Sequence, residues 1–576
     1  MTPIFRALPA ALLCALTLTA CGVQKPAETS RQSKPITQQQ QQQMQQMEPQ
    51  FLYLAAQNAL KDGNRALAAE FLTALVAKDP QAVEPHIQLA ELLLQLGRGD
   101  DAEQQIALLL KKPVAKGDQE KLLLTQARLK VSKDEMDHAL QLLQELFSIN
   151  PVNLPGRNLQ AQILSTQGRI DDALAAIGDA IRSEERPEFL LLQAQLLIKK
   201  KEYKTAEISL MRMRRLAPDS DMAVLILSSI ALLENNPSKA ETVLREFLSS
   251  YPDALRVGHA LGKILVQEER IAEAIIVYRD LSNRSGENPD ILKTLGMLYF
   301  RYKDFEKSEQ IFRKLYQERA DDYSRFYLAA SLETLKRTEE ARQLYESIDP
   351  KSAMAADAEV RLAGLDFADD NLQLALKRLQ HVLKASPDHT EAHLIRSAIR
   401  LTEKRYTLLI EESEATQAKT KVHPQLLFNR AVAFEHLKDY AQMESMLKRV
   451  LSIEPKHADA MNFLGYSYAD RGIKLQRAEQ LILQALQLKP DDGYYLDSLA
   501  WTYFQRGQYK EALKNQQKAV SIINDDPIMF DHLGDILWQS GKAQAAREAW
   551  QKSIDLNVEN PDAVRLKITN GLEIRP

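Results

Sequence analysis

The fold of this chain is set by three neighbouring stretches that repeat one another: LGYSYADRGIKLQRAEQLILQALQLKPDD (residues 464–492), LDSLAWTYFQRGQYKEAL (496–513) and DHLGDILWQSGKAQAAREAW (531–550). In each stretch a small residue follows a leucine, and an alanine comes about twelve residues later. Large apolar residues around these points recur at helical spacing. The pattern predicts two helices in every repeated unit.

The same frame extends back through most of the chain in steps that are almost all 33–35 residues. Units start near residues 49, 83, 120, 154, 187, 221, 255, 289, 322, 356, 390, 424, 458, 493 and 527. The eighth position is always small: Ala56, Ala90, Ala127, Ala161, Ala194, Ser228, Gly262, Gly296, Ala329, Ala363, Ser397, Ala431, Gly465, Ala500 and Gly534. The twentieth position is also small, except in two units: Ala68, Ala102, Ala139, Ala173, Ala206, Ala240, Ala274, Ser308, Ala341, Ala375, Leu409, Met443, Ala478, Ala512 and Ala546.

Small side chains at two fixed positions predict a helical hairpin, because two helices approach closely only where the crossing side chains are small. Prolines such as Pro80, Pro218 and Pro455 fall near the unit ends, where a residue that cannot continue a helix is expected. We therefore expect an all-α fold. The unit near 390 departs from the pattern, and residues 411–421 are polar. We predict one hairpin array over 49–389, an irregular unit or bend over 390–423, and a second array over 424–576.

This repeat resembles the tetratricopeptide repeat in its length, its small-residue positions and its unit-end prolines. The resemblance implies a right-handed superhelical solenoid of about 14–15 repeats. Such solenoids have an extended concave face lined chiefly by the first helix of each unit, which suits the binding of other proteins.

The bulk composition excludes several other classes of protein. The chain has 74 Lys and Arg against 78 Asp and Glu, which argues against the basic footprint that nucleic acid requires. It also argues against a basic face for anionic lipid. The only cysteines are Cys14 and Cys21, so neither a disulfide framework nor a Cys-rich metal site is expected.

The amino terminus has the form of an export signal. Residues 1–20 carry Arg6 before an apolar run of about 14 residues, which is the length of a signal-peptide core. The run ends at Leu18-Thr19-Ala20-Cys21, which resembles a bacterial lipobox and implies cleavage before Cys21 and acylation of that residue. Two or three acyl chains hold a protein stably on a membrane. The alternative is an ordinary secretory signal that contains a cysteine.

Residue Gly22, in place of Asp, resembles the sorting pattern for the outer membrane of Gram-negative bacteria. The expected location is thus the periplasmic side of that membrane. Residues 21–48, with a glutamine run at 38–43, contain few large apolar residues and predict a flexible tether.

Candidate partner-binding residues follow from the usual geometry of the repeat, in which the second, fifth, ninth and twelfth positions of a unit point inward. In the last three units these inward positions include Asp459, Asn462, Tyr466, Tyr494, Asp497, Trp501, Phe504, Asp531, Asp535 and Trp538. Aromatic rings give contact area at low entropic cost, and carboxylates accept from backbone amides or basic side chains. The alternative is that Trp501 and Trp538 pack between neighbouring repeats. Upstream, Lys263, Lys293 and Arg301 suggest a more basic inner face.

We expect neither catalysis nor a cofactor. HExxH, Gly-rich phosphate loops and GxSxG are not found in the sequence. His389 and His393 are four residues apart but have no clear third ligand, so a surface pair is favoured over a metal site.

The last three units, with the Asp-Arg-Gly insertion at 470–472 and the two tryptophans, resemble the long outer-membrane repeat lipoproteins of the LbcA type. That resemblance implies an adaptor that binds a periplasmic C-terminal processing protease and presents substrates such as peptidoglycan hydrolases. The main alternative is a scaffold for pilus assembly, polysaccharide export or another envelope machine, because repeat folds host many functions.

Overall fold

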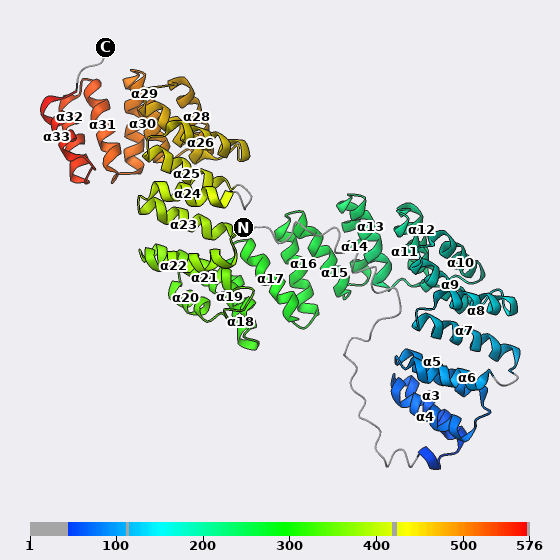
Figure 1. Cartoon of the computed structure of the whole chain (residues 1–576). Coiled ribbons are helices and arrows are strands. Elements are labelled where there is room, and N and C mark those ends of the chain that lie inside the picture. Colours follow the sequence, from blue (N-terminus) through cyan, green and yellow to red (C-terminus); the bar gives the residue numbers. More distant parts are fainter. Residues whose placement is uncertain (1–43, 111–113, 418–422, 573–576) are drawn as a thin grey trace. The chain divides into compact units, whose positions relative to one another are not determined.

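The computed structural model describes residues 44–110, 114–417 and 423–572. Residues 1–43 lie outside that range, so the export signal, Cys21 and most of the expected tether are not described. The described residues are helices joined by short turns, and strands are not found among them (Figure 1). They form two compact units, which meet between Asp304 and Phe305 in the sequence.

Unit 1 contains the helices up to α17. These are α3 Pro49–Lys61, α4 Arg65–Lys78, α5 Val83–Gln95, α6 Gly99–Leu109, α7 Lys116–Ser132, α8 Met136–Ile149, α9 Leu154–Thr166, α10 Ile170–Ser183, α11 Pro187–Lys199, α12 Tyr203–Leu216, α13 Asp221–Leu233, α14 Pro237–Ser250, α15 Leu255–Gln267, α16 Ile271–Arg284 and α17 Pro289–Arg301.

Unit 2 contains the remaining helices. These are α18 Phe305–Glu318, α19 Asp322–Thr334, α20 Thr338–Glu346, α21 Ala355–Ala368, α22 Leu372–Ala385, α23 Thr390–Thr402, α24 Tyr406–Gln417, α25 Pro424–His436, α26 Tyr440–Ile453, α27 Ala458–Asp470, α28 Leu475–Leu488, α29 Gly493–Gln505, α30 Tyr509–Ile522, α31 Pro527–Gln539, α32 Ala543–Asp555 and α33 Pro561–Asn570.

The predicted all-α hairpin fold is confirmed. Within each of the two compact units, successive helices pack as antiparallel pairs, and each pair packs on the next. The first helices begin within one residue of the predicted unit starts, except that α7 begins at Lys116 rather than near residue 120. The unit at 390 also forms a helical pair, α23 and α24, and lies inside unit 2. The proposed domain limits at 389 and 424 stay a prediction.

The small residues lie where the helices of a hairpin cross. A methyl group on Gly465 of α27 would lie 2.6 Å from Ile482 Cγ1 and 3.1 Å from the Ala478 backbone oxygen of α28. A methyl group on Gly534 would lie 2.3 Å from Trp550 Cδ1. Leu409 and Met443, the two large residues at the twentieth position, are also fully buried.

Turns inside the hairpins share one backbone feature that the sequence hides. A residue with positive φ ends the first helix, and it is glycine in some hairpins, such as Gly63 and Gly507, but Lys201, Glu269 or Lys438 in others. Glycine is the usual residue in such a helix stop because it carries no Cβ penalty. Several hairpins therefore close without the glycine signal.

The segment just before α3 is in contact with the repeats. Met44 is buried in the core of the first hairpins, and Lys78 Nζ donates to the Met47 carbonyl over 2.6 Å. Met44 and Met47, which we expected in the tether, thus pack on the array, whereas Gln45, Gln46 and Glu48 are exposed.

Candidate protein-docking surface

The predicted partner-binding residues lie on the first helices of the last repeats, α27, α29 and α31. These helices pack in order, α27 on α29 and α29 on α31. Tyr494 is 56% exposed, and the Asp459 side chain is 52% exposed. The others are less exposed: Asp497, Trp501, Phe504 and Asp535 are buried, and Asn462, Tyr466, Asp531 and Trp538 are partly buried.

Asp497 is a buried acceptor rather than a free carboxylate. It accepts from Gln516 Nε2 of α30 over 2.6 Å and faces His532 Nδ1 of α31 at 3.0 Å. Burial alone would lower the pKa of His532, but the Asp497 carboxylate outweighs that effect, so its pKa is raised. The two residues form a buried ion pair between neighbouring repeats when His532 is protonated.

Trp501 packs between repeats, as the alternative interpretation proposed. It is only 9% exposed, and its ring stacks on His532 with centroids 4.1 Å apart and on Phe504 at 4.8 Å. Its indole nitrogen is buried without a hydrogen-bond partner among the described residues. Tyr466 lies beyond it, with its ring 6.5 Å from that of His532.

Asp531 and Asp535 contact the last helix, α33, and Trp538 contacts the residues that follow it. Lys567 Nζ lies 2.8 Å from a carboxylate oxygen of each aspartate. Burial opposes the charge on Lys567, but the two carboxylates outweigh it and raise its pKa. Trp538 Nε1 donates to the Leu572 carbonyl over 2.8 Å, and its ring packs on Trp550. Other residues of the chain therefore already bind or pack against these three side chains.

The Asp459 side chain on α27 forms hydrogen bonds with other residues of the chain but stays exposed to solvent. It accepts from Lys489 Nζ over 2.9 Å and from the Tyr495 hydroxyl. The Asn462 side-chain oxygen is buried and has no partner among the described residues.

One exposed residue was missed: Ile528, at the second position of α31, is 53% exposed, like Tyr494 at the second position of α29. Its position in the repeat predicted that it points inward, but it was not selected because it is neither aromatic nor acidic.

The inward positions of unit 1 carry different chemistry. On α11 and α13 they are mostly apolar and partly exposed, apart from the exposed carboxylate of Glu188: Glu188, Leu191, Gln195, Ile198, Met222, Leu225, Ser229 and Leu232. On α15 they include Arg256 and Lys263, which are exposed. The basic character predicted around Lys263 therefore lies beside an apolar stripe.

The histidine pair at α23 has structural roles. His389 caps α23 by accepting from the Ala392 backbone nitrogen, and its Nε2 lies 3.2 Å from Asp357. His393 is buried, not on the surface as expected, and its Nε2 lies 2.9 Å from the Pro387 carbonyl. Clusters of three or more metal-ligating side chains are not found among the described residues.

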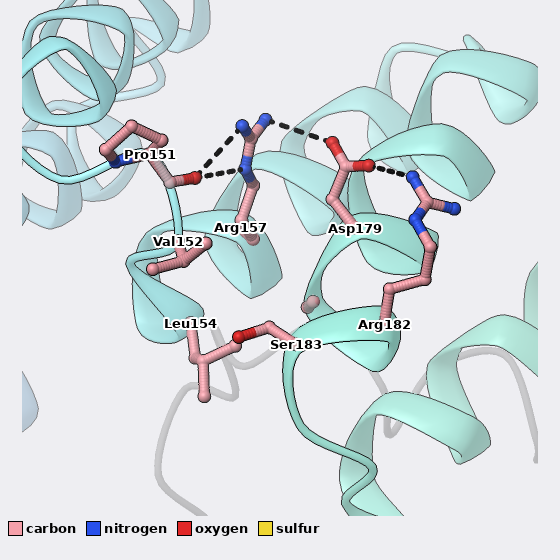
Figure 2. A pocket seen from close by; sticks show the side chains of 8 residues that line it. Pro151, Val152, Leu154, Arg157, Asp179, Arg182 and Ser183 are labelled. Atoms are coloured by element: carbon pink, nitrogen blue, oxygen red, sulfur yellow. Dashed lines mark hydrogen bonds and ion pairs between the residues drawn. The ribbon is translucent and has the colours of Figure 1, made fainter.

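A crevice of about 370 Å³ lies beside the turn between α8 and α9 (Figure 2). Arg157 donates to the Pro151 carbonyl over 3.2 Å and lies 3.6 Å from Asp179, which also pairs with Arg182. As Figure 2 shows, the carboxylate stands between the two guanidinium groups. The two guanidinium groups outnumber the carboxylate by one positive charge, but both already pair with Asp179, and we assign the crevice no ligand.

Comparison with known families agrees with the hairpin architecture. Tetratricopeptide repeat models match residues 59–115, 158–221, 424–457 and 494–524. Together with the stacked hairpins, these matches show tetratricopeptide repeats in the chain, a fold that typically serves as a non-catalytic interaction scaffold.

Among curated proteins, the TPR repeat-containing protein PA4667 of Pseudomonas aeruginosa is 29% identical over 218 residues, which is 37% of this chain and 36% of that protein. The BBSome complex member BBS4 homolog of Drosophila melanogaster is 21% identical and is matched over 57% of its length, by 52% of this chain. The TPR repeat-containing protein MJ1428 of Methanocaldococcus jannaschii is 22% identical over 68% of both chains. The chain thus spans 36% and 57% of the length of the first two relatives.

The solved structure of the APC/C hetero-tetramer Cut9–Hcn1 aligns with a TM-score of 0.35 and 14% identity, over 86% of this chain and 98% of that chain. So low a score carries no conclusion about function. Among the described residues, every helix is too short or too polar to cross a bilayer.

Proposed function

We propose that this protein is a lipid-anchored adaptor on the periplasmic side of the outer membrane of a Gram-negative bacterium. In this proposal it binds a C-terminal processing serine protease and presents substrates such as peptidoglycan hydrolases for degradation. The lipobox-like Leu18–Cys21 sequence supports the anchor, and the resemblance of the last three units to LbcA-type lipoproteins supports the partners.

The observation that carries the proposal is the presence of two chemically different surfaces on one chain. Unit 2 exposes Tyr494, Ile528 and the Asp459 carboxylate. Unit 1 exposes an apolar stripe beside Arg256 and Lys263. An adaptor must hold two different proteins at once, and two surfaces with different preferences meet that requirement.

The mechanism needs no chemistry from the adaptor itself. A protease and a substrate held on one scaffold meet at an effective concentration of roughly millimolar for a short connection. The acyl chains on Cys21 would confine that encounter to one membrane.

The test is a reconstitution with the full lipidated chain. The proposal expects that the chain copurifies with a periplasmic C-terminal processing protease. It also expects that the purified chain speeds degradation of a peptidoglycan hydrolase by that protease in detergent solution. Cys21→Ser controls for the anchor: on vesicles the acceleration should fall, while in detergent it should persist. Copurification with export or pilus components alone, without acceleration of proteolysis, would instead indicate the scaffold function.

A further inference from the structure

The apolar stripe of unit 1 is a surface that the other repeats leave partly uncovered. Its apolar members are Leu191 and Ile198 of α11 and Met222, Leu225 and Leu232 of α13, all partly exposed. They occupy the second, fifth and twelfth positions of their units, which are positions predicted to point inward. Helices α11 and α13 are the first helices of successive hairpins (Figure 1).

Helix α13 is apolar all round, with the sequence DMAVLILSSIALL. Its buried residues Ala223, Ile226 and Ile230 pack in the core that α13 shares with α11 and α12. A helix that is hydrophobic on every side is normally buried on every side. Here the side with Met222, Leu225 and Leu232 is partly exposed. One apolar side of this helix is therefore not fully covered by other helices of the chain.

The next first helix, α15, packs against α13 and adds positive charge. Lys263 is exposed and makes no ion pair among the described residues. The Arg256 side chain is 62% exposed, and its partner is Asp221 at 3.2 Å. His259 between them contacts the Tyr278 hydroxyl at 3.1 Å, and burial, with Lys263 nearby, lowers its pKa. The charge on this helix face therefore comes from Arg256 and Lys263.

On the other side of the stripe, α9 presents amides and a hydroxyl: Asn158, Gln162 and Ser165. From α9 to α15 the inward side thus changes from amides to mostly apolar side chains, with Glu188 as an exposed carboxylate on α11, and then to cations. We infer that the α9–α15 face binds an extended segment of a client protein in which large apolar side chains are followed by carboxylates. Calling that segment a client rests on the proposed adaptor function, whereas the binding preference does not.

Charge complementarity selects this occupant. A membrane surface would be favoured by many clustered cations, and here two cations, of which Arg256 is paired with Asp221, lie at one end of the apolar stripe. The apolar side chains would supply most of the affinity, and the cations would set the direction of the segment.

The experiment measures peptide binding to the full chain in detergent by fluorescence anisotropy. The probe is a fluorescein-labelled peptide with leucines in its first half and glutamates in its second half. Two comparison peptides replace the glutamates with lysines or the leucines with serines. The glutamate peptide should bind about tenfold more tightly than either comparison peptide.

Matched variants locate the site. The double substitution Met222→Ser and Leu225→Ser should weaken binding about tenfold. Its control is Ile208→Ser with Met211→Ser on the outer side of α12, where the two residues are 59% and 54% exposed. That control should leave binding unchanged. Lys263→Glu should weaken the glutamate peptide about fivefold and strengthen the lysine peptide, whereas Lys204→Glu on α12 should do neither.

Several outcomes would overturn the inference. One is equal binding of all three peptides, and another is equal loss in the stripe and outer-face variants with helicity preserved by circular dichroism. A third is loss of self-association in the stripe double variant, measured by light scattering, without any effect on peptide binding; a second copy would then be the occupant. No protease is present in these assays, so the adaptor function can fail while this preference stands, and the reverse.

Discussion

The inward residues of unit 1 and of the last repeats of unit 2 occupy the same positions of the same repeat, yet they are used differently. In unit 2, Asp497, Trp501 and Asp535 bind or stack on other residues of the chain. In unit 1, Leu225 and Lys263 remain open. The comparison shows that the position in the repeat determines which side of the helix a side chain lies on. The neighbouring repeat determines whether that side chain is exposed to a partner.

The largest expected effect separates packing from binding at Trp501. Trp501→Ala should lower the free energy of unfolding of the last repeats by about 4 kcal/mol, because a buried, stacked ring is removed. The three tryptophans of the chain, Trp501, Trp538 and Trp550, all lie in the last repeats, so tryptophan fluorescence in urea reports on this region. A change below about 1 kcal/mol would mean that Trp501 is a free anchor.

Lys567→Met should cost about 3 kcal/mol, because Asp531 and Asp535 lose the cation that faces them in a largely buried site. Urea unfolding followed by tryptophan fluorescence checks this value. The control is Lys518→Met, which removes an exposed pair with Asp491 and should cost at most about 0.5 kcal/mol. Equal costs for the two variants would remove the distinction between the covered and the open parts of unit 2.

Ala512→Leu should destabilise the C-terminal repeats by about 2 kcal/mol, because Ala512 is fully buried at a helix crossing. Ala385→Leu, at an exposed site on α22, is the control. Thermal unfolding and protease resistance measure the difference, and unchanged values would contradict the position of the crossing.

The Asp497–His532 pair predicts a pH dependence that belongs to unit 2. Because the pKa of His532 is raised in the folded state, the pair stabilises fully below the unfolded-state pKa of about 6.5. That contribution is lost as the pH rises through the folded-state pKa. Asp531 and Asp535 also favour the charged form, and Trp501 and Tyr466 lie against the ring. The urea midpoint by tryptophan fluorescence should therefore fall over this pH range, and His532→Gln should remove the fall.

The smallest effect is expected at the stripe of unit 1. Leu225→Ser should change the stability of α13 by less than about 1 kcal/mol, because the side chain is only partly covered. Hydrogen exchange of the α13 amides measures it. A cost of about 3 kcal/mol, as at a core leucine, would place Leu225 in the packing and leave less of it for a partner.

Most of the fold could be predicted from the sequence, because the repeat carries its own signal. Gly465 and Ala478 are small for a steric reason that acts within one hairpin, over only a few turns of helix. The start of α7 at Lys116 was missed, because the extra turn lies outside the repeat period. The turns at Lys201 and Glu269 were hidden, because the positive φ that closes a hairpin is not confined to glycine.

The candidate site was less predictable. Position in the repeat correctly put Tyr494 on an exposed surface, but it could not show that Lys567 covers Asp531 and Asp535. His532 gave no sequence signal beyond its place beside Asp531, although it links Asp497 and Trp501.

The sequence by itself determined the hairpins and their order, because small residues at the crossings act locally and recur at a fixed spacing. It also fixed the lipobox-like chemistry around Cys21, for which the acyl anchor remains a proposal. Only the tertiary structure decided which inward side chains are open. Their burial depends on residues about one repeat away, such as His532 against Asp497 and Lys567 against Asp531, and that distance along the chain becomes contact only when the repeats stack.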